Sequence, residues 1–208
     1  EIVRRVLAGD AASFELIMRR YNRLLFRVAR SIVGNDAEAE DVLQESYLHA
    51  FEHLHQFEGR SRFSTWLTKI AVHEAMGRRR KQRRLRLIDS NDTGEDAVFS
   101  YPVDRDGFEE ASLNELRGLL AAAVDSLPPE LRVVFTMRMI ERLSTERTAE
   151  CLGLTPSNVK VRLHRARSAL RRWINHRVGE ESRRLYDFDG EHCDRVVRGV
   201  LGRLALGR

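Results

Sequence analysis

Apolar residues recur at helical spacing along most of this 208-residue chain. One stripe runs from Phe14 to Ile32 at intervals of three and four residues, a second covers 42–54, and a third begins at Phe63. Such one-sided periodicity is typical of amphipathic helices that bury one face. None of these stripes is interrupted by the four prolines of the chain, which are Pro102, Pro128, Pro129 and Pro156. The pattern predicts an all-α fold.

One short run leaves the choice between helix and strand open. Residues 133–136, Val-Val-Phe-Thr, would suit a strand when taken alone. The preceding Pro128 and Pro129 favour the first turn of a helix, and no partner strand is evident. We therefore expect a helix here.

Charge divides the chain into parts. Seven of the nine residues at 78–86 are basic, whereas 87–112 hold eight carboxylates and one arginine together with glycines and a proline. The acidic stretch shows no sustained period and is interpreted as a flexible linker. The expected parts, in chain order, are a first helical domain at 1–88, an acidic linker at 89–112, a second helical domain at 113–175 and a short helical C-terminal extension at 176–208.

Several classes of protein are disfavoured by composition. No apolar run approaches the ~20 residues that span a bilayer, so we expect no membrane insertion. No charged-then-apolar signal segment opens the chain. The two cysteines, Cys151 and Cys193, form no disulfide framework and suit a reducing cytoplasm. The net charge is +5.

Residues 143–173 have the features of a helix-turn-helix. Ser144 is placed to cap a first helix, Gly153 supplies the positive φ of a tight turn, and Thr155 with Pro156 begins a second helix. A narrow core face is predicted for Val159, Leu163, Ala166 and Leu170. The outer face and its flanks carry Ser157, Asn158, Lys160, Val161, Arg162, His164, Arg165 and Arg167.

That outer face is interpreted as a DNA-reading surface, because the basic face coincides with the helix that enters the groove. Val161 in its middle suits contact with a thymine methyl. The alternative is an ordinary helical hairpin with a solvated basic face.

The segment 57–86 joins a polar loop to an aromatic helix and a basic tail. The loop is flanked by Phe57 and Phe63, which could hold an unstacked base. Lysines and arginines along one helix neutralise phosphates. Aromatic and apolar residues such as Trp66 more often form core, and a basic tail can simply be solvated.

With these features the chain resembles the group IV, or extracytoplasmic-function, sigma factors of bacterial RNA polymerase. The motifs that carry the resemblance are AEDVLQESYLHAF at 39–51, FEGRSRFSTWLTKIAV at 57–72, LPPELRVVFTMRMIERLSTERTAECLGL from 127, and VKVRLHRAR up to 167. Together they cover roughly residues 8–174.

The resemblance implies specific roles. A surface that docks on a coiled coil of the polymerase β′ subunit would be formed by Asp41, Gln44 and Glu45. Residues at the −10 element would be Glu58, Gly59, Arg60, Ser61, Arg62, Lys69, His73, Arg78, Arg79, Arg80 and Lys81. The outer face of the helix-turn-helix would read the −35 element. The linker would thread through the polymerase channels, so contact with the β subunit is implied as well, and an anti-sigma factor is a further expected partner.

Two departures from the family pattern concern single positions. His73 stands where the family often has Asn, which puts the −10 preference in question. Thr148 stands where the family often has an apolar residue, which should weaken core packing. The C-terminal motif around Phe188 and Cys193 resembles an extension found in some members.

Two other functions are compatible with parts of the sequence. The carboxylates Asp36, Glu38, Glu40, Asp41 and Glu45 could form the metal site of a nuclease, but they cluster at one helix start, where they favour the helix dipole. A two-domain helix-turn-helix regulator with a ligand-sensing first domain is the other alternative. We expect no enzyme, no cofactor and no metal, since His192 and Cys193 are too few ligands. The expected location is the cytoplasm, at the nucleoid.

Overall fold

The computed structural model describes residues 2–88, 108–184 and 190–205, and these residues contain helices and no strand. The expected all-α fold is confirmed. The greater part of the expected linker, 89–107, lies outside the described residues. Its last five positions, 108–112, belong to a helix.

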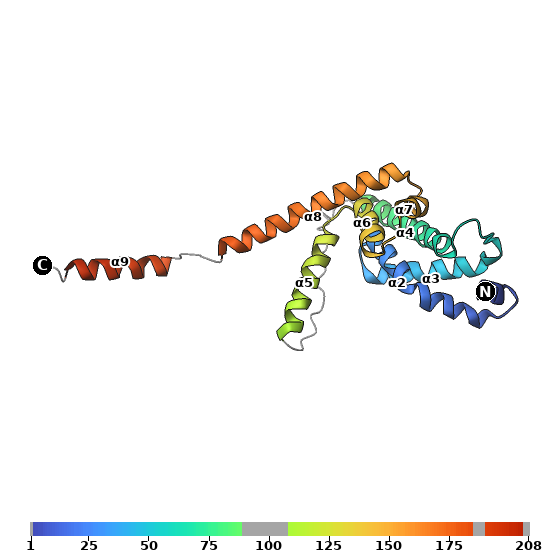
Figure 1. Ribbon diagram of the computed structural model, residues 1–208, viewed down its shortest axis with the longest axis horizontal. Helices are drawn as coiled ribbons and strands as arrows, with labels where there is room; N and C mark the ends of the chain where they lie inside the picture. The colour runs from blue at the N-terminus through green and yellow to red at the C-terminus, as the bar shows by residue number, and fades with distance from the viewer. Residues whose placement is uncertain (1, 89–107, 185–189, 206–208) are drawn as a thin grey trace. The chain divides into compact units, whose positions relative to one another are not determined.

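The first half of the described chain contains four α-helices and two short 3₁₀ segments. In chain order these are α1 (Ile2–Leu7), η1 (Ala11–Ser13), α2 (Phe14–Val33), α3 (Asp36–Glu52), η2 (Leu54–Gln56) and α4 (Phe63–Ile88). The helices α2, α3 and α4 each pack against the other two (Figure 1). The basic run at 78–86 continues α4 as helix and is not a separate tail.

The second half begins with α5 (Phe108–Asp125) and ends with α9. After α5 come α6 (Pro129–Phe135), the π-helical turn η3 (Thr136–Ile140), α7 (Thr145–Leu152), α8 (Pro156–Arg184) and finally α9 (Gly190–Ala205). Residues 133–136 are helical, which confirms the choice made from the preceding prolines.

The first helices bury a core of their own. Leu25, Leu54 and Leu67 come from three different elements and are almost fully buried, with Phe14 and Tyr47 packed edge to face beside them. Trp66 lies against this cluster and is half-buried, as expected of a core aromatic. This cluster positions α3 and α4 side by side.

A second core joins the two halves of the chain. Val28 and Val42 from the first half share it with Val134, Met137 and Val159 from the second, and all five are buried. Apolar faces from both expected domains are therefore buried against one another. The compact unit comprises residues 1–170. Apolar spacing identifies the face that a helix buries, but not the helix that covers that face.

Two arginines reinforce this joint core. Arg30 of α2 donates to Asp36 at 3.1 Å and also to Asp125 at the end of α5. Arg132 of α6 donates through Nε to the carbonyl oxygen of Ser31 at 2.8 Å. Both side chains are about nine-tenths buried. Removing one partner from a buried pair costs ~3–5 kcal/mol, because a charge is then left in the core.

The helix-turn-helix forms as its capping residues predict. Ser144 accepts from the backbone N–H of Arg147 at 3.1 Å, and Thr155 accepts from that of Asn158 at 3.2 Å. Gly153 has a φ of 63°, the left-handed conformation that ends α7 without a steric penalty. These local interactions set the angle at which α8 leaves the turn.

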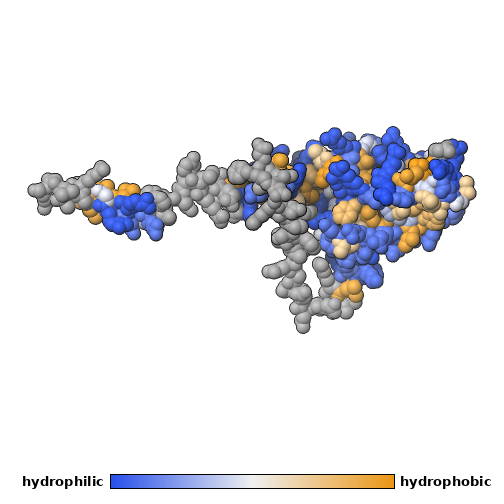
Figure 2. Space-filling model, turned by 90° about the horizontal axis from the view of Figure 1, so that it is seen from below, coloured by the Kyte–Doolittle hydropathy of each residue, from blue (hydrophilic) through white to orange (hydrophobic). Residues whose placement is uncertain are grey.

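The C-terminal part of the chain is also helical. α8 continues without a break to Arg184, so the expected boundary at 175 falls inside a helix. Arg171–Arg208 forms the second compact unit. In α9 the expected apolar stripe is present but exposed, with Val196, Val200 and Leu201 each more than half exposed, and Figure 2 shows it as an orange row beside blue side chains.

Thr148 provides a test of packing at one departure from the family pattern. It is fully buried in α7, and its hydroxyl oxygen has no hydrogen-bond partner. An orphan buried hydroxyl costs ~1–3 kcal/mol. We expect the Thr148→Val variant to gain about 1 kcal/mol and to melt about 2–4 °C higher, measured by thermal circular dichroism.

The matched control for that variant is Thr68→Val. Thr68 is equally buried, but its hydroxyl donates to the carbonyl oxygen of Ser64 at 2.6 Å. This substitution removes a hydrogen bond and should lower the melting temperature or leave it unchanged. A loss of stability in Thr148→Val equal to that of Thr68→Val would contradict the assignment of Thr148 as an unsatisfied group.

Candidate nucleic-acid interface

The acidic and amide side chains of α3 form an exposed surface. Asp41, Gln44 and Glu45 are all exposed, because Val42 and the neighbouring Ser46 take the buried face. Gln44 also lines a groove of about 490 Å³ between α2 and α3. The groove is lined by Met18, Asn22, Arg23, Phe26, Arg27, Glu40, Leu43, Gln44 and Tyr47. An apolar floor with a charged rim can accept a partner helix.

The loop between η2 and α4 is exposed at its tip. Glu58, Gly59, Arg60 and Arg62 are exposed, Ser61 is half-buried, and Arg60 forms an ion pair with Glu58. Gly59 has a φ of 74°, which a side chain would strain.

The aromatic rings at the foot of this loop pack against one another. The centroid of Phe57 lies 5.2 Å from that of Phe63 and 5.6 Å from that of Trp66. The structure thus uses the rings to hold the loop in place, and they do not stand apart as an open pair that could sandwich a base.

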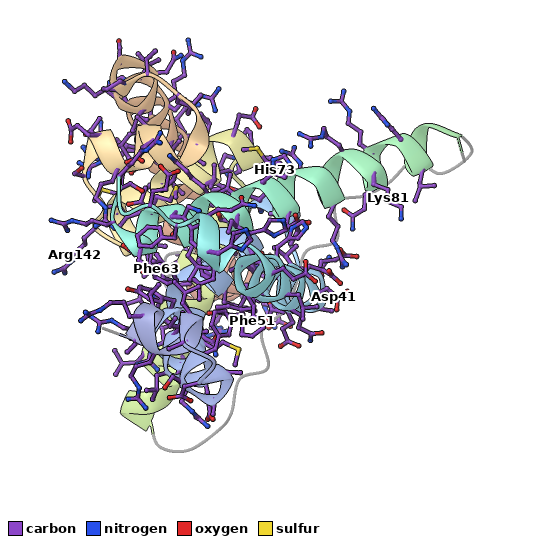
Figure 3. The ribbon with its side chains drawn as sticks, turned by 90° about the vertical axis from the view of Figure 1, so that its right-hand side faces the viewer. Asp41, Phe51, Phe63, His73, Lys81 and Arg142 are labelled. Atoms are coloured by element: carbon purple, nitrogen blue, oxygen red, sulfur yellow. The ribbon has the colours of Figure 1, made fainter. Side chains whose placement is uncertain are left out.

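The basic helix α4 presents most of its charges to solvent. His73, Arg79, Arg80 and Lys81 are exposed, and Figure 3 shows α4 extending past the other helices from His73 to Lys81. Lys69 lies nearer the joint core, where its Nζ is 2.9 Å from Glu150 of α7. One predicted DNA contact is therefore already engaged by the second half of the chain.

Arg78 is the second basic residue of α4 that is held by carboxylates. Its Nη1 donates to Asp41 at 2.6 Å and to Glu38 at 3.0 Å. Three of the five carboxylates that suggested a nuclease are thus paired with arginines, since Asp36 accepts a hydrogen bond from Arg30 as well. Among the described residues, no group of three or more potential ligands is placed to hold a metal ion.

The outer face of α8 is exposed where the sequence predicted it. Val159, Ala166 and Leu170 are buried and Leu163 is half-buried, so the helix is oriented as its apolar spacing indicates. The residues turned to solvent are Ser157, Asn158, Lys160, Val161, His164, Arg165 and Arg167, with Arg162 half-buried beside them. This face is cationic, with one apolar side chain at its centre.

The contact between α4 and α7 contains residues that the sequence analysis did not single out. Arg147 donates to the Ser64 hydroxyl at 2.8 Å, and Glu150 accepts a hydrogen bond from Lys69. Cys151 is buried in the same contact, 3.9 Å from the Thr65 carbonyl oxygen. Burial, and to a smaller extent the charge of Glu150, raises the pKa of the Cys151 thiol to about 11, so it stays protonated at neutral pH.

No local pattern could have identified these partners, because they are separated by more than 80 residues. Ser64 and Arg147 are 83 positions apart, and Lys69 and Glu150 are 81 apart. From the sequence, Glu38 is a candidate only for the alternative metal site. Its spacing of three residues from Asp41 places both carboxylates on one side of α3, which is the signal that relates them.

Comparisons with known proteins agree with these features. Residues 17–85 match the family model of Sigma-70 region 2, and 117–170 match that of Sigma-70, region 4. The ECF RNA polymerase sigma factor SigW of Bacillus subtilis is 30% identical over 83% of this chain and 94% of its own length. The RNA polymerase sigma-H factor of Pseudomonas aeruginosa is 33% identical over 82% of this chain and 90% of its own length.

Solved structures share the fold. CnrH, determined in complex with the cytosolic domain of CnrY, matches with a TM-score of 0.58 at 22% identity, over 84% of this chain and 96% of that one. The sigma factor RpoE of Bartonella quintana, crystallised with the anti-sigma factor NepR, matches with a TM-score of 0.62 at 22% identity, over 78% and 96%.

Proposed function

We propose, since this chain belongs to the extracytoplasmic-function sigma factors of bacterial RNA polymerase, that its α3 surface binds core polymerase while α4 and α8 bind promoter DNA. A sigma factor is an initiation factor and not an enzyme. It directs polymerase to promoters through their −35 and −10 elements. The observation that carries the residue assignments is the exposure of three distinct surfaces, one acidic and amide-bearing and two basic, on one helical scaffold.

The polymerase surface is assigned to Asp41, Gln44 and Glu45. Their exposure on α3 and the adjoining groove support docking of a polymerase helix, as the resemblance to the family implies for the β′ coiled coil. The two acids and the amide suit a partner that offers basic and amide groups.

The −10 surface is assigned to the loop at 58–62 and to α4. The exposed loop tip can receive a base that has left the stack, and the cationic helix can follow the strand's phosphates. His73, Arg79, Arg80 and Lys81 are exposed for this role, whereas Lys69 and Arg78 must first leave their carboxylate partners.

The −35 surface is assigned to the outer face of α8. In a helix-turn-helix the second helix enters the major groove, with its N-terminal residues nearest the bases. Lys160, Val161, His164 and Arg165 occupy that position, and Arg162 and Arg167 lie where phosphates pass.

The polymerase assignment predicts the behaviour of a double variant. Gln44→Ala combined with Glu45→Arg should weaken binding to core polymerase by about tenfold or more, because a reversed charge at an interface costs several kcal/mol. Binding would be measured by competition for fluorescently labelled core enzyme. The control is Glu52→Arg, an exposed acid at the end of the same helix.

Circular dichroism spectra should be the same for both variants, since all three side chains are exposed. Equal affinity of the double variant and the parent for core polymerase would overturn the assignment of this surface.

Further partners follow from the family and from the relatives. A contact with the polymerase β subunit is assigned to the segment at 89–112, as the family resemblance implies. RpoE was crystallised with an anti-sigma factor, and an anti-sigma factor is a proposed partner of this chain as well. No described helix is long and apolar enough to cross a membrane. We place the protein at the nucleoid, where promoter DNA and polymerase are found.

A further inference from the structure

The two proposed surfaces of the first domain meet at one guanidinium. Arg78, from the basic helix α4, donates from a single nitrogen to Asp41 and to Glu38 on α3, at 2.6 and 3.0 Å. Asp41 belongs to the proposed polymerase surface and Arg78 to the proposed DNA surface. Figure 3 shows Asp41 beside the helix that carries His73 and Lys81.

The three side chains are accessible enough to exchange partners. Arg78 is 31% exposed, Glu38 is 28% exposed and Asp41 is 56% exposed. The hydrogen bond that Arg78 donates to Asp41 is the largest cause that raises the pKa of Arg78 above its ordinary value, ahead of the one to Glu38. Asp41 is thus both the closer carboxylate and the one nearer to solvent, where a polymerase side chain can reach it.

A carboxylate and a phosphate compete for the same guanidinium. Arginine binds both anions through the same N–H groups, and two carboxylates beside it repel an approaching phosphate. The neighbouring cations of α4 differ in this respect. Among the residues that the structure describes, no ion pair engages Arg79, Arg80 or Lys81.

We propose that Glu38, Asp41 and Arg78 form a coupling triad that links polymerase binding to binding of the −10 strand. A basic group of the polymerase that pairs with Asp41 withdraws one carboxylate and leaves Arg78 available to a DNA phosphate. Glu38 is a positioning residue that keeps the released guanidinium on the DNA side of α3. Binding free energies are reciprocal, so DNA on Arg78 also frees Asp41 for polymerase. This inference rests on the proposed function.

The test measures DNA binding by the free, full-length protein. The probe is a fluorescein-labelled 20-mer of oligothymidylate, followed by fluorescence anisotropy over a series of KCl concentrations. Asp41→Asn removes the competing charge but keeps the shape of the side chain. We expect it to bind the oligonucleotide roughly three- to tenfold more tightly, with a salt slope steeper by about 0.7, the value for one added phosphate contact on a single strand.

Two further variants separate coupling from a general change of net charge. Glu40→Gln removes the exposed carboxylate that directly precedes Asp41 on α3. We expect this variant to change the affinity for the oligonucleotide less than about twofold. Arg78→Ala in the Asp41→Asn background should cancel the gain. An equal gain in Glu40→Gln, or a gain that persists without Arg78, would overturn the triad.

A second measurement distinguishes failure of the triad from failure of the proposed function. In competition for core polymerase, Arg78→Ala should bind more tightly than the parent, because Asp41 is released, and Asp41→Asn more weakly. If neither variant changes core binding, the polymerase role of Asp41 is wrong and the coupling falls with it. If Asp41→Asn weakens core binding but gains no DNA affinity, only the triad is overturned.

Discussion

Covalent closure of the contact between α4 and α7 should abolish promoter-specific transcription. Cysteines placed at 69 and 150 lie where Nζ of Lys69 and Glu150 are 2.9 Å apart. A bismaleimide with a reducible spacer would join them in a Cys193→Ser background. We expect the cross-linked protein to initiate transcription at least about 100-fold less often. Sequence-specific contacts with DNA are worth about 4–10 kcal/mol in total, and the cross-linked protein loses those with one of the two promoter elements.

The reason is geometric. The −10 and −35 elements are separated by about 25 base pairs, or about 85 Å of B-form duplex at 3.4 Å per base pair. Glu150 contacts α4 directly, and Lys160 of the recognition helix follows it by ten residues, which span at most ~36 Å even when fully extended. The two DNA surfaces of the closed unit therefore cannot reach both elements of straight DNA together.

Cleavage of the spacer provides the control for this experiment. Reduction should restore transcription to the level of the same double-cysteine protein before cross-linking, and single-cysteine variants treated in the same way should not change. Run-off transcription with purified core polymerase is the measurement. Undiminished initiation by the cross-linked protein would show that promoter binding does not require α7 to leave α4.

Substitutions in the recognition helix should separate base contacts from phosphate contacts. Arg165 lies on the exposed face of α8, opposite the face that buries Val159 and Ala166. We expect Arg165→Ala to cost ~1–3 kcal/mol on the specific site and to relax the preference at one base position. Sequencing of the DNA that the holoenzyme selects from a random library would show the relaxed position.

Arg167→Ala is the matched comparison on the same helix. Arg167 is exposed and donates to the sulfur of Met139 at 3.0 Å, towards the flank of the reading face. It should weaken binding to all sequences alike and reduce the salt slope by about one unit. If both variants lose affinity uniformly and keep the same sequence preference, Arg165 is a phosphate contact and the proposed placement of α8 is wrong.

Local interactions account for the parts of the structure that were predictable. The caps at Ser144 and Thr155 and the turn at Gly153 involve residues a few positions apart, and each formed as expected. The buried face of α8 followed from apolar spacing alone. The exposed positions of Asp41, Gln44 and Glu45 followed from the same argument applied to α3.

The contacts of other residues are decided by tertiary packing, which the spacing of residue types does not specify. The rings of Phe57 and Phe63 flank the loop in sequence, yet they pack against each other, since Trp66 lies one turn further along α4 and completes the cluster. Lys69 belongs to a basic helix in sequence, yet Glu150 neutralises it.

The sequence by itself determined that this protein is helical, where the helix-turn-helix is capped and which faces α3 and α8 bury, because those properties arise from contacts within three or four residues. Only the tertiary structure decided that Val42 of α3 and Val134 of α6 share one core, and that Asp41 holds Arg78. An apolar face is complementary to any other apolar face, and a carboxylate to any nearby cation. The choice among partners is made by the packing of the whole chain, in which one arrangement buries most apolar surface without leaving Arg30 or Arg132 unpaired.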